Sequence, residues 1–109
     1  KFLDYLDDLG ADIVIDAQPS PDVSATGIRA VLERFQAEEQ AVSRNIFAVI
    51  ELARTEHDYA TDQFLQWFAR EQHEEEKLAR AVLDKHDLIG DGPNSAYLFD
   101  LELARLAAV

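Results

Sequence analysis

The sequence contains no cysteine and no methionine, and only three prolines and four glycines among its 109 residues. Because no disulfide can form, nothing points to secretion, and we expect a cytoplasmic protein. We also expect no signal peptide, and no apolar run is long enough to cross a bilayer. A chain of this length is expected to form one domain.

Basic residues are scarce as well. Ten Lys and Arg stand against 22 Asp and Glu, which gives a net charge of −12. A charge of this sign opposes binding to nucleic acid or to an anionic membrane, so neither is an expected partner. It suits cations, although a solvated acidic surface that only confers solubility is a common explanation. Hydrophobic residues make up 48% of the chain, which supports a folded core.

The spacing of the apolar residues predicts an all-α protein. The predicted segments are a helix end at 1–10, a connection at 11–25, long helices at 26–56 and 58–88, and a short helix at 95–108. Gly10 is expected to stop the first helix, and Thr26 and Asp58 are expected to cap the two long ones. Fully extended, the connection would span roughly 50 Å, the length of a helix of about 30 residues. It can therefore join two parallel helices, as in four-helix bundles with one long crossover.

The two long helices carry glutamates where an apolar residue is expected. The turn at 55–58 is so short that these helices must run antiparallel. Glu39 occupies an apolar position of the first helix, and Glu71 and Glu75 occupy the apolar stripe of the second. Reversal in this turn places Glu39 beside Glu75 in the hairpin. Glu71 and Glu74 are then expected within about one helical turn of that level.

This arrangement predicts a metal site. A single glutamate in a helix seam usually reaches solvent or pairs with Lys or Arg. Several that meet at one level would repel each other unless a cation lies between them, because a buried carboxylate without a partner is costly. Oxygen ligands suit Mg, Ca, Mn or iron, so the spacing does not determine the metal. His73 points away from Glu71 and is expected to be a surface residue.

Several stretches resemble bacterial-type non-haem ferritins. The resemblance to the fourth bundle helix of that family lies in FLQWF followed by EQHEEEKL. The resemblance to the third helix lies in AEEQAVSRNI, and that to the short fifth helix lies in SAYLFDLELA. The end of the second helix, with the start of the long crossover, corresponds to KFLDYLDDLGAD. The resemblance covers essentially the whole chain and implies a ferritin-like four-helix bundle of which only the C-terminal half is present.

The resemblance implies iron storage, with non-haem iron as the metal. Fe(II) would be oxidised to Fe(III) by O₂ at a di-iron centre, inside a homo-oligomeric cage of ferritin subunits. Glu39 and Glu75 match ligands of the second iron, and Gln72 matches a residue that lines the centre near bound oxygen. Glu71 and Glu74, together with Glu75, match ligands of a third iron site. The chain would thus be a ferroxidase if the rest of the site is supplied.

The family's first helix and the Glu-x-x-His segment of its second helix have no counterpart here. The chain is therefore expected to be a fragment, to be completed by another chain, or to pair with a second copy. The alternative is a truncated, catalytically silent helical protein that packs with a partner and binds divalent metal weakly. The haem-binding branch does not match, because Glu71-Gln72-His73-Glu74 is not a Glu-x-x-His motif and no methionine is present to hold a haem.

Overall fold

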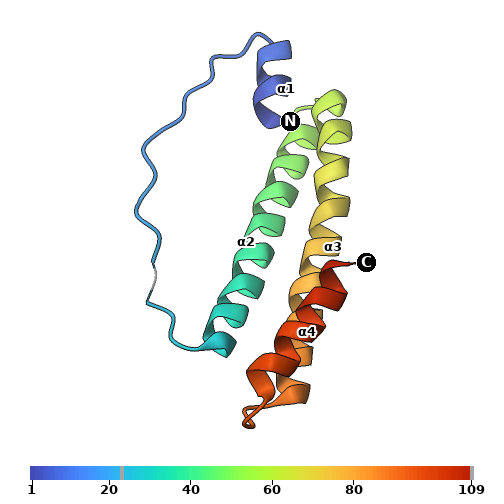
Figure 1. Cartoon of the computed structure of the whole chain (residues 1–109). Coiled ribbons are helices and arrows are strands. Elements are labelled where there is room, and N and C mark those ends of the chain that lie inside the picture. Colours follow the sequence, from blue (N-terminus) through green and yellow to red (C-terminus); the bar gives the residue numbers. More distant parts are fainter. Residues whose placement is uncertain (23, 109) are drawn as a thin grey trace.

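The structure is a computed structural model and describes residues 1–22 and 24–108. Val23, which falls within the predicted connection, and Val109 lie outside the described residues. The described helices are α1 (Phe2–Asp8), α2 (Ile28–Thr55), α3 (Tyr59–Ile89) and α4 (Ser95–Ala107). No strand occurs in the described ranges. The prediction of an all-α protein is therefore confirmed, and Figure 1 shows the arrangement.

The turn between α2 and α3 closes a long antiparallel hairpin (Figure 1). His57 adopts a positive φ of 58°. Its backbone N–H donates to the carbonyl of Arg54 at 3.1 Å, and the N–H of Asp58 donates to the carbonyl of Ala53 at 2.7 Å. These bonds satisfy the last carbonyls of α2. The Asp58 carboxylate then accepts from the backbone N–H of Thr61 at 3.1 Å, so the predicted cap of α3 is confirmed.

The predicted cap of α2 is wrong. Gly27, not Thr26, is the N-cap residue, and no side chain caps this helix. The crossover enters α2 with a φ of 83° at Gly27, a left-handed conformation that glycine adopts without steric cost and a β-branched threonine does not. The helix consequently begins two residues later than expected, at Ile28.

The short helix α1 lies against the part of α3 nearest the turn. The rings of Tyr5 and Phe64 stack with centroids 4.1 Å apart, and those of Phe2 and Phe68 stack at 4.2 Å. Gly10, with a φ of 68°, terminates α1 as predicted, because its N–H donates to the carbonyl of Asp7. Helices α1 and α2 run in the same direction, and the crossover spans the length of the hairpin between them (Figure 1).

The last helix, α4, folds back along the far end of α3 (Figure 1). Phe99 is buried there and meets the ring of His86 edge-on at 5.3 Å between centroids. Lys85 and Glu102 form an ion pair at 3.6 Å across the same interface. The two short helices therefore cover opposite ends of the hairpin.

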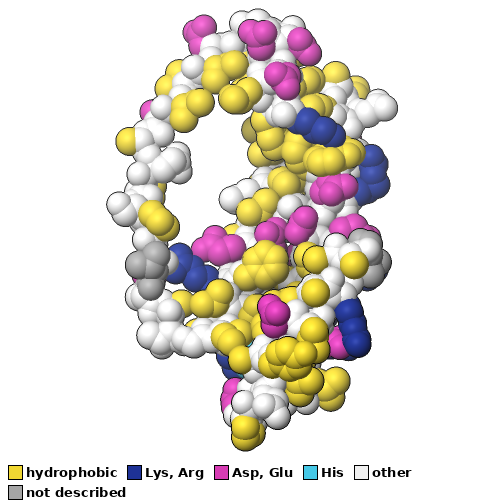
Figure 2. Space-filling view, viewed as in Figure 1, with side chains coloured by type: hydrophobic (Ala, Val, Ile, Leu, Met, Phe, Trp, Pro, Cys, Tyr) yellow, Lys and Arg dark blue, Asp and Glu magenta, His cyan; other side chains and the backbone are white. Residues whose placement is uncertain are grey.

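The hydrophobic core lies between α2 and α3. Its buried apolar members on these helices are Ile50, Ala53, Leu65, Ala79 and Val82. Other apolar side chains remain exposed on the hairpin and on the crossover. Figure 2 shows an opening between the hairpin and the crossover. No described helix is both long and apolar enough to span a membrane.

One lateral face of the hairpin is apolar and largely exposed, although the Lys1 ammonium lies over the ring of Trp67, 3.2 Å from its centroid. We call it the open apolar face, and it comprises Val42, Val49, Trp67 and Leu78. At about 100° per residue, these side chains lie on the same side of the contact between α2 and α3. Each of them is more than a third exposed to solvent.

Candidate metal centre

The predicted site residues lie near the middle of α2 and α3, between the parts covered by the two short helices. Gln72 is the most buried of them, with 8% of its surface exposed. Glu39 and Glu75 are partly buried, whereas Glu71 and Glu74 are exposed. Glu71 was expected inside the apolar stripe. It reaches solvent because the open apolar face leaves that side of α3 uncovered.

Glu39 and Gln72 meet across the hairpin. The amide nitrogen of Gln72 donates to the Glu39 carboxylate at 3.2 Å and to the Glu39 backbone carbonyl at 3.1 Å. The same nitrogen lies 3.2 Å from the hydroxyl oxygen of Ser43. The contact surface between α2 and α3, which we call the seam, therefore contains a polar cluster of Glu39, Ser43 and Gln72 among mainly apolar buried side chains.

Two members of this cluster were not predicted. Ser43 is only 3% exposed, and its hydroxyl donates to the carboxylate of Glu76 at 2.8 Å. The serine follows Glu39 by one helical turn and so faces the same seam, a spacing that could have identified it. Glu76 could not be separated from its acidic neighbours by spacing alone.

The acidic side chains of the site have few basic partners. Lys77 approaches Glu74 at 3.8 Å, and both side chains are largely exposed, so this ion pair contributes little. Within the described part of the chain, no Lys or Arg forms an ion pair with Glu39 or Glu75. Two partly buried carboxylates without a basic partner favour a nearby cation.

The structure brings fewer metal ligands together than the sequence predicts. Across residues 1–22 and 24–108, no three His, Cys, Asp or Glu side chains are grouped closely enough to hold one metal ion. The contacts place Gln72 opposite Glu39 and Glu76 opposite Ser43. Direct pairing of Glu39 with Glu75, and the contribution of Glu71 and Glu74, stay predictions.

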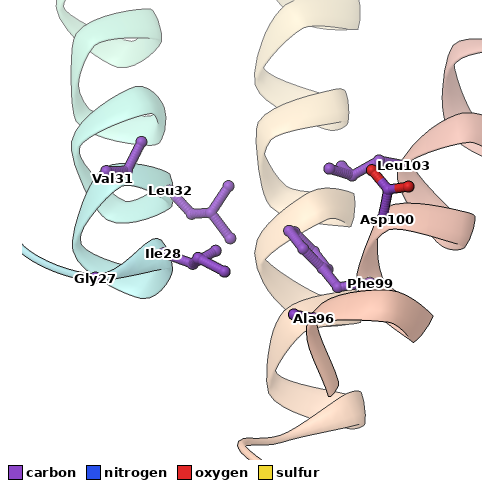
Figure 3. Close-up of a pocket in the computed structure, with 8 residues that line it drawn as sticks. All are labelled: Gly27, Ile28, Val31, Leu32, Ala96, Phe99, Asp100 and Leu103. Atoms are coloured by element: carbon purple, nitrogen blue, oxygen red, sulfur yellow. The ribbon is translucent and has the colours of Figure 1, made fainter. Parts of the chain in front are cut away.

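A separate hollow of about 550 Å³ opens between the start of α2 and α4 (Figure 3). Its walls are mainly apolar side chains, namely Ile28, Val31, Leu32, Phe99 and Leu103. Of the described residues that line it, Asp100 is the charged one. A single carboxylate in an apolar wall does not supply the oxygen ligands that a metal requires, so the hollow is not a candidate metal centre.

Two long antiparallel helices, a long crossover that enters them and a carboxylate–amide cluster in their seam define a ferritin-like helical protein. Residues 1–89 match the family model of the Ferritin-like domain. The chain belongs to this family, and the resemblance found in the sequence is confirmed.

Known relatives agree with this assignment. The chain is 38% identical over 104 residues to a bacterial non-heme ferritin of Staphylococcus epidermidis, and 34% identical over 107 residues to one of Campylobacter jejuni. These matches cover 95% and 98% of this chain, but only 63% and 64% of the relatives. An open pore ferritin from the hyperthermophilic archaeon Archaeoglobus fulgidus superimposes with a TM-score of 0.88 at 32% identity, covering 93% of this chain and 62% of that one.

Proposed function

We propose that this chain is part of a cytoplasmic iron-storage protein that oxidises Fe(II) to Fe(III) with O₂ inside a cage of ferritin subunits. The observation that carries the proposal is the buried amide of Gln72 bonded to the Glu39 carboxylate in the hairpin seam. The bacterial relatives are named non-heme ferritins, which supports the same conclusion.

Iron is the substrate in this proposal. Glu39 and Glu75 bind one of two Fe(II) ions held close together, and O₂ accepts one electron from each ion. Gln72 orients the Glu39 carboxylate and lines the space that O₂ enters. Glu71 and Glu74, with Glu75, hold a further iron ion on the exposed side of α3. Carboxylate oxygens are suitable ligands for iron in helical bundles of this type.

The carboxylates of this chain supply only part of a di-iron centre. The chain spans less than two-thirds of the length of the relatives above. The remaining ligands would come from residues of a longer protein, from a partner chain or from a second copy. The open apolar face provides the surface on which such helices would pack.

A catalytically silent helical protein is the second candidate. It is favoured by the lack of a three-ligand group among the described residues. The intact mass of the protein purified from its source separates the two candidates. A mass near 12.3 kDa without a companion chain supports the silent protein. A polypeptide about half as long again, or a stoichiometric partner chain, supports the ferroxidase. A polypeptide of that length would agree with the relatives, because this chain covers 63% of the first one.

The proposed ligands are tested by the double substitution Glu39→Ala with Glu75→Ala in the assembled protein. We expect fast Fe(II) oxidation, followed by absorbance of the ferric product, to be abolished, because two ligands of one iron are lost. Circular dichroism should show unchanged helix content. The matched control replaces two exposed glutamates of α2, Glu38→Ala with Glu51→Ala, and should oxidise Fe(II) normally. Unchanged oxidation in the first variant would contradict the assignment of Glu39 and Glu75.

A further inference from the structure

Ser43 contacts the Gln72 amide and Glu76 contacts Ser43, but neither residue binds iron in the proposed reaction. Ser43 is buried on α2 and Glu76 is partly buried on α3. Their side chains form the shortest hydrogen bond of the cluster, 2.8 Å between the hydroxyl oxygen and a carboxylate oxygen. A buried polar pair at this position is costly unless its hydrogen bonds are satisfied.

The partners of Gln72 determine the orientation of its amide group. The nitrogen carries two protons, and it faces the Glu39 carbonyl, the Glu39 carboxylate and the Ser43 hydroxyl. Both Glu39 groups can only accept, so an amide oxygen in the same place would meet lone pairs instead of protons. The amide nitrogen of Gln72 must therefore face α2, and its carbonyl oxygen must point elsewhere.

The single proton of the Ser43 hydroxyl has two acceptors within reach. The Glu76 carboxylate lies at 2.8 Å and the Glu39 backbone carbonyl at 3.1 Å. A helical serine often donates to the carbonyl four residues back. The bond to the Glu76 carboxylate is the shorter of the two, so it takes the proton. As a result, the Ser43 lone pairs and the Glu39 carbonyl both remain available to the amide of Gln72.

Glu76 lies on the side of the seam away from the proposed ligands. At about 100° per residue, Glu76 is about 40° to one side of Gln72 on α3, whereas Glu75 is about 60° to the other side. Among the described residues, Glu76 is hydrogen-bonded to Ser43, and Ser43 in turn contacts Gln72 of the candidate centre.

We propose that Ser43 and Glu76 are positioning residues for the iron site. Glu76 aligns the Ser43 hydroxyl, Ser43 holds the Gln72 amide, and the amide binds one oxygen of the Glu39 carboxylate. The other Glu39 oxygen, which has no hydrogen bond to any described residue, is thereby directed to the cation. We call this chain of hydrogen bonds from Glu76 to Glu39 the relay. Its use in iron oxidation rests on the proposed function, whereas the hydrogen bonds themselves are independent of that function.

The first test compares Fe(II) oxidation in Glu76→Ala and Ser43→Ala with that in the conservative variants Glu76→Gln and Ser43→Thr. The alanine variants should bind Fe(II) about tenfold more weakly or more, seen as a raised KM, because outer partners of metal ligands have effects of this size. Glu76→Gln retains an acceptor oxygen and Ser43→Thr retains the hydroxyl, so both should restore most of the affinity. The exposed-site control Glu51→Ala should leave the KM unchanged.

The second test needs no iron. In a crystal structure of metal-free Glu76→Ala, we expect the Gln72 amide nitrogen to leave hydrogen-bond distance of the Glu39 carboxylate or to occupy more than one rotamer. If the unsubstituted protein fails to oxidise Fe(II), the proposed function is wrong. The metal-free structure of Glu76→Ala still shows in that case whether Glu76 positions the Gln72 amide. Two results would overturn the relay: Gln72 unmoved in Glu76→Ala, or Glu76→Gln as impaired as Glu76→Ala, which would indicate that Glu76 acts through its charge.

Discussion

The side chain that points most directly across the seam is neutral. Gln72 is buried and uses its amide protons on α2, while the charged neighbours Glu75 and Glu76 on either side are only partly buried. Burial of a neutral amide with its bonds made is far cheaper than burial of a carboxylate. The hairpin can therefore keep a tightly packed line of contact and still carry carboxylates beside it.

Leu65 lies two helical turns before Gln72 on the same line of α3 and is only 2% exposed. Leu65→Ala should lower the free energy of unfolding by about 3 kcal/mol, because it removes buried methyl groups and leaves a cavity. Denaturant unfolding followed by circular dichroism measures this change. Leu88→Ala, at a position 80% exposed, is the control and should stay within about 0.5 kcal/mol of the unsubstituted protein. Equal losses in the two variants would contradict the proposed core.

The helix ends differ in how far local sequence determines them. Asp58 caps α3 through bonds to Thr61, three residues away, so the signal is contained in a short stretch. The start of α2 instead depends on the direction in which the crossover arrives, and this requires the positive φ of Gly27. Thr26 has the right side chain for a cap but stands one residue too early.

The cap of α3 predicts a dependence of stability on pH. The hydrogen bond from the Thr61 hydroxyl, and then that from the Thr61 backbone N–H, lower the pKa of Asp58 below its usual value of 3.8. Because the folded pKa is depressed, the stabilisation is present above the unfolded pKa and is lost as the pH falls through the folded one. Thermal unfolding scans below about pH 4 should therefore show a loss of stability.

Two substitutions isolate this contribution. Asp58→Asn keeps a side-chain acceptor and should unfold near the normal temperature at neutral pH, with a weaker decline in acid. Asp58→Ala should lower the unfolding temperature by a few degrees at neutral pH. If acid lowered the unfolding temperature equally in Asp58→Asn and in the unsubstituted protein, the Asp58 cap would not be the cause of the loss of stability.

The molecule as a whole is an elongated hairpin, 56 Å in its longest dimension, with short helices at its two ends. Its central portion keeps the open apolar face, and Glu39 and Glu75 lie toward the same side by helix geometry. A two-helix hairpin with an uncovered apolar stripe is incomplete as a folded layer, because the stripe must pack against another element. We therefore expect the proposed assembly and the proposed metal site to depend on the same surface.

Leu78→Glu tests this surface. Leu78 is 38% exposed on the open apolar face, and a charge there should reduce association, because desolvating a carboxylate in an apolar contact is unfavourable. Analytical ultracentrifugation should show a smaller species than the unsubstituted protein forms. Leu88→Glu, at a site far more exposed, is the matched control and should sediment normally. Identical sedimentation of both variants would place the association surface elsewhere.

Local information in the sequence was sufficient for the helices. The apolar period, the stop at Gly10 and the cap at Asp58 all act over a few residues, and the structure confirms each of them. The antiparallel hairpin followed from the short turn alone. The glutamates in the seam were visible for the same reason, because they interrupt an otherwise regular period.

Only the tertiary structure decided which of these side chains meet. The offset between α2 and α3 depends on how their side chains interlock along the whole contact, and a shift of one residue changes every pair. In the folded chain, Glu39 bonds to Gln72, and Ser43 joins them to Glu76, a glutamate that spacing gave no reason to select. Sequence periodicity determines which face a residue occupies, but the packing between the helices determines its neighbour.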